Sequence, residues 1–332
     1  MTKETYASSG VQIDKAELFV ERLKSNARRQ AHAGMWKSAG GYAAVQPLTA
    51  DLGVAVTTDG VGTKVLVADE LKKFDTVGID LVAMVANDLI CVGATPNMFL
   101  DYFAVGRLDD SLADDIISGI IEGCDRADMY LAGGETAELP GLYQDGHYDL
   151  AGFAVGSVKK ADLLSGDEIK AGQKLIAVAS SGIHSNGLSL ARKVLPKEKW
   201  QMLLEPTAIY VKAALSAFAE MPGAIKGLAH ITGGGWRNLL RLNEKVGFNL
   251  EKPLPLPEVF TLIQNHVEEE EMYKTFNMGM GLGIIAEEKD SAQIIDCFKS
   301  FGHNAALVGS VTSEAGLVRI AQKSFVLKNK HS

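Results

Sequence analysis

The stretch Val54-Ala55-Val56-Thr57-Thr58-Asp59-Gly60-Val61-Gly62-Thr63-Lys64 decides the fold of this chain. Its opening residues are mostly β-branched and predict a strand over Val54–Thr58. Gly60 and Gly62 predict a turn in which the backbone can approach a ligand closely. Asp59 and Lys64 add opposite charges beside the end of the strand. An apolar helix is expected from Thr76 to Gly93, so strand, turn and helix follow one another as in an α/β fold.

The expected helix carries three polar residues, Asp80, Asn87 and Asp88, among apolar neighbours. At 3.6 residues per turn, Asn87 lies about 20° around the helix from Asp80, and Asp88 about 80° from it, so one face is polar. A stripe that faces water would explain Asp80 alone. Together with Asp59, Lys64 and the glycine turn, the set indicates a site for a magnesium-bound polyphosphate, in which carboxylates bind the cation and the lysine binds a phosphate.

The composition is that of an ordinary globular protein large enough for two domains, with 332 residues, 47% hydrophobic and 22% charged. The formal charge of -8 and the pI of about 5.5 argue against a broad basic surface, so we expect no nucleic-acid partner and no membrane partner. The sequence shows neither a signal peptide nor an apolar run of membrane-spanning length, and we expect a cytoplasmic protein. Cys91, Cys124 and Cys297 fit reduced core thiols.

Polar residues gather between Lys159 and Gly172, and we place the domain boundary there. The predicted organisation is an N-terminal arm over residues 1–48, an N-terminal domain over 49–165 and a C-terminal domain over 166–332. The arm contains an expected amphipathic helix from Lys15 to Ala31. Its basic residues indicate either an arm that closes over an anionic ligand or a solvated helix face; they are Lys24, Arg28, Arg29 and Lys37.

A second carboxylate loop is expected after the strand Met98–Val105 and the helix Ser111–Asp128, for which Ser111 is the expected cap. A short strand over Met129–Ala132 leads into the glycine-rich loop Gly133–Gly141. Glu135 in this loop follows a strand end, as Asp59 does, so the two carboxylates converge if their strands are neighbours. A turn with a helix cap explains the loop equally well.

Two loops of the second half also suggest chemistry. The turn Ser180–Gly187 follows the strand Lys174–Ala179 and holds His184 and Asn186 between glycines, near the start of a helix. A lone histidine is more often structural, but this one lies among small polar residues. The loop Thr232–Gly235 precedes an expected helix over Trp236–Asn243 and could expose backbone N–H groups to a phosphate. A flexible connection is the alternative, and the neighbouring His230 favours binding.

Five ordered motifs together resemble the phosphoribosylformylglycinamidine cyclo-ligase family, also called aminoimidazole ribonucleotide synthetases. The resemblance covers nearly the whole chain, and five motifs in one order are far more specific than any one of them. The motifs are Asp59-Gly-Val-Gly-Thr-Lys64, Gly78-Ile-Asp80 with Asn87-Asp88, Gly133-Gly-Glu-Thr-Ala-Glu138, Ser181-Gly-Ile-His-Ser-Asn-Gly187 and Ile231-Thr-Gly-Gly-Gly235.

This resemblance implies an ATP-dependent cyclisation of formylglycinamidine ribonucleotide in purine biosynthesis. It also implies a two-domain α/β protomer that forms a homodimer through its N-terminal sheets and binds ATP and Mg²⁺ on the N-terminal domain. The implied metal ligands are Asp59, Asp80, Asp88 and Glu135. The implied nucleotide contacts are Lys24, Asp59, Gly60, Gly62, Thr63, Lys64, Asn87, Gly133, Gly134 and Glu135.

The ribotide is expected on the loops of the second domain, at Ser181, Gly182, His184, Ser185, Asn186, Gly233, Gly234 and Gly235. The expected catalytic residues are His184, Asn186 and Lys64. We assign to His184 either proton transfer from the attacking nitrogen or stabilisation of the formyl oxygen, because the ordinary pKa of histidine lies near the working pH.

Two other classes of function share parts of this pattern. A phosphotransferase of the same superfamily, like thiamine-monophosphate kinase or selenophosphate synthetase, could carry the same carboxylates. No cysteine precedes Cys91, which argues against the second of these, because it usually has a cysteine or selenocysteine in its N-terminal arm. A non-catalytic nucleotide-binding dimer is the other alternative, and the intact charged set argues against it.

Overall fold

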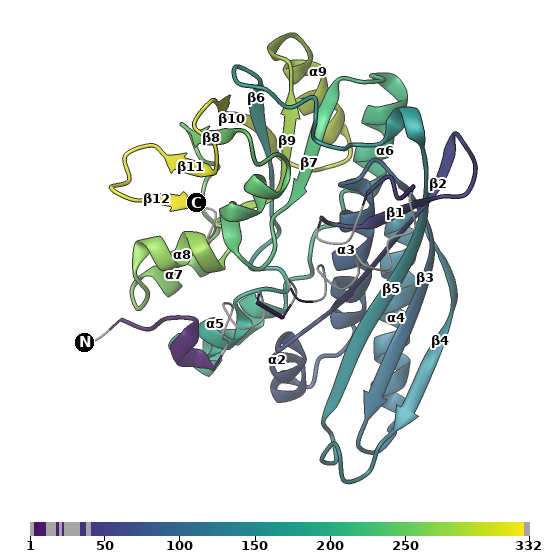
Figure 1. Ribbon diagram of the computed structural model, residues 1–332. Helices are drawn as coiled ribbons and strands as arrows, with labels where there is room; N and C mark the ends of the chain where they lie inside the picture. Colours follow the sequence, from purple (N-terminus) through teal and green to yellow (C-terminus); the bar gives the residue numbers. More distant parts are fainter. Residues whose placement is uncertain (1–2, 11–17, 20–21, 23–33, 38–40, 329–332) are drawn as a thin grey trace.

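The computed structural model describes residues 3–10, 18–19, 22, 34–37 and 41–328 (Figure 1). Most of the helix expected from Lys15 to Ala31, with the side chain of Lys24, lies outside the described residues. The predicted mixed α/β fold is confirmed, with one sheet in each half of the chain and helices packed on both sheets.

The N-terminal sheet has the strand order β1-β2-β5-β3-β4 among the described residues. β3 and β4 are parallel, and the other neighbours are antiparallel. α3 and α4 cover one face of this sheet, and α2 precedes them (Figure 1). The bounds are β1 Ala44–Pro47, β2 Leu52–Gly60, α2 Lys64–Leu71, α3 Val77–Ile90, β3 Thr95–Val105, α4 Asp110–Ala127, β4 Tyr130–Glu138 and β5 Tyr148–Lys159.

α3 is the central helix of this half, and almost all of its residues are buried. Gly78 lets α4 pack closely on it, because a Cβ at this position would lie 2.4 Å from the backbone nitrogen of Ile120. α4 begins two residues earlier than its expected cap indicates: Asp109, not Ser111, is the cap, and its side chain accepts a hydrogen bond of 3.0 Å from the Leu112 nitrogen.

The loop expected at Gly133–Gly141 is largely a strand. β4 continues to Glu138 and pairs with β3 along its whole length, from Met98 opposite Tyr130 to Val105 opposite Glu138. Backbone pairing with β3 overrides the weak strand preference of the glycines. The expectation that residues 133–138 form a turn is therefore wrong, which matters for the position of Glu135.

The C-terminal sheet has the strand order β12-β11-β8-β10-β6-β9-β7 among the described residues. α6 and α9 pack together, and α9 also contacts β6 and β10. The strands are β6 Lys174–Ala179, β7 Ile225–His230, β8 Gly247–Leu250, β9 Met280–Ala286, β10 Ala305–Thr312, β11 Leu317–Ile320 and β12 Val326–Lys328. The α-helices are α5 Leu188–Val194, α6 Val211–Glu220, α7 Glu258–Gln264, α8 Glu269–Thr275 and α9 Glu288–Ser300. The 3₁₀ helices of the whole chain are η1 Ala7–Ser9, η2 Lys160–Asp162, η3 Lys197–Leu204 and η4 Gly235–Arg241.

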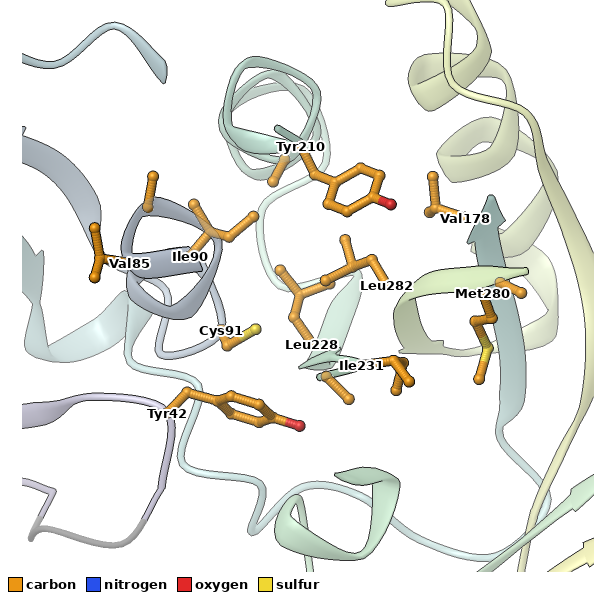
Figure 2. Close-up of a cluster of buried hydrophobic side chains, with 14 of the residues drawn as sticks. Tyr42, Val85, Ile90, Cys91, Val178, Tyr210, Leu228, Ile231, Met280 and Leu282 are labelled. Atoms are coloured by element: carbon orange, nitrogen blue, oxygen red, sulfur yellow. The ribbon is translucent and has the colours of Figure 1, made fainter. Parts of the chain in front are cut away.

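The two halves share a buried apolar boundary (Figure 2). Ile90 and Cys91 of the first half face Leu228 and Tyr210 of the second. The chain passes from one sheet to the other between residues 159 and 174, and the division into an arm and two domains stays a prediction. None of the helices in the described part of the chain is long and apolar enough to cross a membrane.

Candidate active site

A buried ion pair links the glycine turn to α3. Lys64, the first residue of α2, and Asp80 are both fully buried, and the lysine Nζ lies 2.9 Å from Oδ1 and 2.7 Å from Oδ2 of the carboxylate. Nζ also donates a 2.7 Å hydrogen bond to the carbonyl oxygen of Glu205. Burial lowers the pKa of Lys64, and the charge of Asp80 opposes that shift. The buried ammonium group of Lys64 therefore links α2 to α3 and to the segment that follows η3.

Asp80 is the centre of this network. The backbone nitrogen and the hydroxyl of Thr207 donate hydrogen bonds of 2.8 and 2.5 Å to Oδ1, and the Ser185 hydroxyl donates a third of 3.2 Å. Protein donors therefore occupy this carboxylate, and a metal ion would have to displace at least one of them. The roles of Asp80 as a metal ligand and of Lys64 as a nucleotide contact stay predictions.

Asp59 in β2 and Asp88 in α3 form a second charged pair. Desolvation, followed by the negative charge of Asp88, raises the pKa of Asp59 to about 6. The Asp59 Oδ1 accepts a 2.7 Å hydrogen bond from the nitrogen of Gly60, and the Asp88 side chain is 15% exposed. Two carboxylates held close enough to repel each other form a place where a cation is favoured.

The donor set of this pair suits Mg²⁺ carried by a nucleotide. Among the described residues, no group of three or more histidine, cysteine and carboxylate side chains is arranged to hold a metal ion. Mg²⁺ in phosphate-transfer sites typically takes one or two carboxylates, with phosphate oxygens and water as its other ligands. Asp59 and Asp88 meet that requirement, because the two carboxylates lie close enough to repel each other.

Glu135 lies apart from these carboxylates in the same chain. β5 and β3 stand between β2 and β4, and Glu135 is paired with Tyr102, whereas Asp59 is paired with Gly152. Residues opposite each other in a sheet point to the same face. Gly152 faces the helices, since a Cβ there would touch Leu81, and Tyr102 is exposed on the open face. The condition for convergence, that the strands of Asp59 and Glu135 are neighbours, is therefore not met within one chain.

Asn87 connects the two halves through hydrogen bonds of its side-chain amide. It is fully buried, its Nδ2 donates a 2.9 Å hydrogen bond to the Ala208 oxygen, and its Oδ1 accepts a 3.0 Å bond from the Tyr210 nitrogen. The remaining amide hydrogen faces His230, whose Nε2 is 3.5 Å from the Asn87 Nδ2. The side-chain amide of Asn87 is thus engaged within the protein, and its contact with a nucleotide stays a prediction.

The His184 loop reaches the same boundary from β6. The His184 ring is 1% exposed, and its Nε2 accepts hydrogen bonds of 3.2 and 3.4 Å from the nitrogens of Ser181 and Ala208. Desolvation, with the charges of His230 and Lys64, lowers the pKa of His184 well below its usual value. The assumption that its pKa lies near the working pH is therefore wrong, and the ring is neutral with a proton on Nδ1.

The glycine loop after β7 packs against the His184 loop. A Cβ on Gly233 would lie 2.9 Å from the Asn186 Oδ1, so the side chain of Asn186 rests on the loop backbone. Gly234 and Gly235 have φ of +100° and +57°, which glycine adopts without strain. The expected helix begins at Gly235 and is a 3₁₀ helix. The two loops assigned to the ribotide are therefore brought together.

The other assigned residues have identifiable surroundings. Thr63 lies 2.9 Å from Ser189, hydroxyl to hydroxyl, and Gly62 has φ +66° with open space around it. The Ser181 hydroxyl donates to the Pro206 oxygen, and the Gly182 oxygen accepts a 2.9 Å bond from Asn277. Gly133 and Gly134 lie in β4, where Gly134 leaves room for the Asp101 side chain.

Sequence reasoning missed several residues of this junction. Thr207 and Glu205 belong to no motif, and nothing in the sequence marks them before their contacts with Asp80 and Lys64 are known. Arg241 carries a positive charge that acts on Asp59, and its guanidinium lies 5.7 Å from the centre of the Tyr42 ring. His230 was noted only as a neighbour of the glycine loop, yet its Nδ1 lies 2.9 Å from the Asp88 Oδ1.

The sequence and the fold of this chain are similar to those of known proteins. Residues 40–158 match the family described as AIR synthase related protein, N-terminal domain, and residues 170–322 match its C-terminal domain. A phosphoribosylformylglycinamidine cyclo-ligase of Carboxydothermus hydrogenoformans is 44% identical over 94% of this chain and 97% of its own length. The protein of the same name from Sorangium cellulosum is 45% identical over 93% and 95%. The solved structure of AaThiL complexed with AMPPCP and TMP is 16% identical, with a TM-score of 0.66 over 92% of this chain and 93% of that one, and shares its fold.

Proposed function

The chain belongs to the phosphoribosylformylglycinamidine cyclo-ligase family, and on that premise we propose that it closes the imidazole ring of aminoimidazole ribonucleotide. The substrate is formylglycinamidine ribonucleotide, ATP drives the reaction, and ADP and phosphate are released. The observation that carries the proposal is that motif residues of the first half meet the second half in one hydrogen-bonded junction, where Asp80 bonds Ser185 and Thr207 and Asp88 bonds His230.

The chemistry requires activation of a poor leaving group. A formamide oxygen does not leave readily, so ATP transfers its γ-phosphoryl group to that oxygen and forms an iminophosphate. The neighbouring amidine nitrogen then attacks the formyl carbon, the C–O bond breaks, and phosphate departs as the ring closes. Such transfer depends mainly on positioning and charge neutralisation. A rigid junction between two halves, one for the nucleotide and one for the ribotide, supplies the positioning.

Asp59 and Asp88 are the residues that would hold Mg²⁺ in this site. When bound, Mg²⁺ neutralises phosphate charge during the transfer. Desolvation is the main cause of the raised pKa of Asp59, and the additional repulsion from Asp88 supports this assignment. The AMPPCP in AaThiL supports ATP as the nucleotide. Arg241 is exposed near the pair and is a further candidate for a phosphate contact.

His184 and Asn186 orient the ribotide loop in this proposal. The neutral ring of His184 accepts two backbone hydrogen bonds at Nε2, and its Nδ1 and the Asn186 Nδ2 are buried without a partner among the described residues. Two unpartnered buried donors beside the glycine loop suit the oxygen atoms of an incoming ligand. His184 therefore donates a hydrogen bond to the substrate rather than exchanging a proton as a base.

A homodimer through the N-terminal sheets is part of the proposal. The face of this sheet away from α3 and α4 exposes apolar side chains, an arrangement that favours burial against another surface. They are Leu52, Val56, Met98, Leu100, Tyr102, Tyr130 and Phe153, each between 37% and 72% exposed.

The dimer also gives Glu135 a place in the site. β1 pairs with β2 only as far as Val56, so the edge of β2 beside Asp59 has no partner strand among the described residues. β4 forms the opposite edge of the sheet in the described part of the chain. We propose that β4 of a second copy lies along the free part of β2, which brings the strand that carries Glu135 beside the Asp59 end of β2. A cytoplasmic location completes the proposal, because ATP and the ribotide are cytoplasmic metabolites.

The test is a reconstituted reaction with ATP, Mg²⁺ and formylglycinamidine ribonucleotide. The proposal predicts equal amounts of ADP and of the diazotisable amine of aminoimidazole ribonucleotide, and no ADP when the ribotide is omitted. A protein that binds ATP and forms ADP with another acceptor would support the kinase-like alternative. Nucleotide binding without turnover in every mixture would support the non-catalytic one.

A further inference from the structure

His230 is the last residue of β7 and lies at the boundary between the halves. Unlike a histidine that only fills space in a core, it contacts a carboxylate of the other half. The side chain is fully buried, and its Nδ1 lies 2.9 Å from the Asp88 Oδ1. Asp88 is one of the two carboxylates that repel each other beside the glycine turn. His230 therefore touches the proposed magnesium ligand directly, although it comes from the other half of the chain.

The surroundings of the ring define which nitrogen carries the proton. On the Nε2 side, the Asn87 Nδ2 is 3.5 Å away. The orientation of the Asn87 amide is fixed, because its oxygen accepts from the Tyr210 nitrogen and its Nδ2 also donates to the Ala208 oxygen. Nδ2 therefore presents a hydrogen to Nε2, which accepts it. Nδ1 carries the remaining ring proton and donates it to Asp88.

This hydrogen bond restricts the carboxylate of Asp88. One oxygen is held by a fully buried ring, while the side chain keeps 15% of its surface exposed. The exposed part is the part that a ligand can reach. A histidine that fixes one oxygen of a carboxylate leaves the other in a set direction, and groups that orient metal ligands in this way typically change metal affinity 10–100-fold.

We propose that His230 is a positioning residue that holds Asp88 in the orientation required for magnesium-bound ATP. Because the glycine loop Thr232–Gly235 begins two residues later, the same contact also sets the ribotide loop relative to the metal site. This inference rests on the proposed function, since it requires a metal–nucleotide complex at Asp59 and Asp88. The contact between His230 and Asp88 would thus make the orientation of the metal ligand depend on how the two halves pack.

Two isosteric variants test the role of His230. In His230→Asn the side-chain amide replaces Nδ1 and keeps a donor for Asp88, whereas in His230→Gln it replaces Nε2 and loses that donor. His266→Gln, at an exposed position, is the matched control. The readout is Mn²⁺ affinity in the presence of AMPPCP, measured by electron paramagnetic resonance, with thermal unfolding recorded for each protein.

We expect His230→Gln to weaken Mn²⁺ binding about tenfold or more and His230→Asn to stay within about threefold of the wild type. Equal affinity of the two variants and the wild type would overturn the positioning role and leave the proposed function intact. Failure of the wild type to bind Mn²⁺ with AMPPCP would instead remove the metal site and the role of His230 together.

A measurement on the wild type covers the case in which His230→Gln does not fold. Nitrogen-15 spectra of histidine-labelled protein distinguish the two neutral forms of the ring, and His230→Asn identifies the signal. We expect the proton on Nδ1 and a change in that signal when Mg²⁺ and AMPPCP are added. A ring protonated on Nε2 would contradict the hydrogen bond to Asp88 and overturn the proposal.

Discussion

Replacement of Lys64 by methionine breaks the most deeply buried charge pair described in this chain. Methionine has nearly the length of the lysine side chain and fills most of its space, so the change mainly removes the ammonium. The Asp80 carboxylate, fully buried and 2.7 Å from Nζ in the wild type, then keeps only the donors from Thr207 and Ser185. Removal of one member of a buried ion pair typically costs about 3 to 5 kcal/mol, because the other charge remains buried.

The matched control is Lys274→Met, which removes a lysine from an exposed pair. Lys274 and Glu270 are 38% and 45% exposed and lie one helical turn apart, so their interaction contributes about 0.3 to 0.5 kcal/mol. The assay is urea unfolding followed by circular dichroism and tryptophan fluorescence, with the slopes compared to confirm that the same surface unfolds. We expect a loss of about 3 to 5 kcal/mol for Lys64→Met and less than about 1 kcal/mol for the control.

A third protein separates the effect of the two charges on stability from the effect of the volume that the two side chains fill. In Lys64→Met with Asp80→Leu both charges are gone, and we expect the double variant to be more stable than Lys64→Met alone. Affinity for AMPPCP, measured below the unfolding transition, should stay close to that of the wild type, because the ammonium is enclosed. A Lys64→Met protein as stable as the control would refute the reasoning. A stable one that has lost nucleotide affinity would show that Lys64 contacts the nucleotide.

Three further outcomes are expected. The folded-state pKa of Asp59, about 6, lies above its ordinary value of 3.8, so the folded state holds this proton more tightly and stability falls as the pH rises between these values. Metal-free Asp59→Asn should lack this fall and exceed the wild type at pH 7 by about 1 to 3 kcal/mol in urea unfolding; an unchanged pH slope would contradict this. Asp88→Asn and Glu135→Gln should each abolish turnover, yet recover about a quarter of wild-type activity after their subunits mix, because about half of the dimers then hold one native site. No recovery after verified exchange would place Glu135 outside the site. Leu100→Arg puts a charge on the open sheet face and should give monomers in sedimentation velocity, whereas an intact dimer would exclude this face as the interface.

The helix around Asp80 could be predicted because its pattern is local. A run of apolar residues with a 3.6-residue period gave the bounds Thr76–Gly93, and α3 spans Val77–Ile90. The motif order also identified which loops meet, since the His184 and Gly233 loops are in contact. These features depend on residues close in sequence or on a pattern shared by a family.

Other features depend on partners that the sequence does not identify. Glycine-rich β4 is a strand because β3 pairs with it, and no side-chain pattern in the sequence predicts that pairing. The buried state of Lys64 depends on Glu205, far along the chain and outside every motif. The ordinary pKa of histidine misled the assignment of His184 for the same reason: packing against distant segments buries the ring, and desolvation lowers its pKa.

The most direct test of the proposed reaction follows the formyl oxygen. Formylglycinamidine ribonucleotide labelled with ¹⁸O in its formyl group is converted with ATP and Mg²⁺ in unlabelled water, and the released phosphate is analysed by ³¹P resonance or mass spectrometry. Transfer of the phosphoryl group to the formamide oxygen predicts one ¹⁸O in each phosphate formed with aminoimidazole ribonucleotide. Phosphate that contains only oxygen from water and ATP, with the amine still produced, would contradict the account.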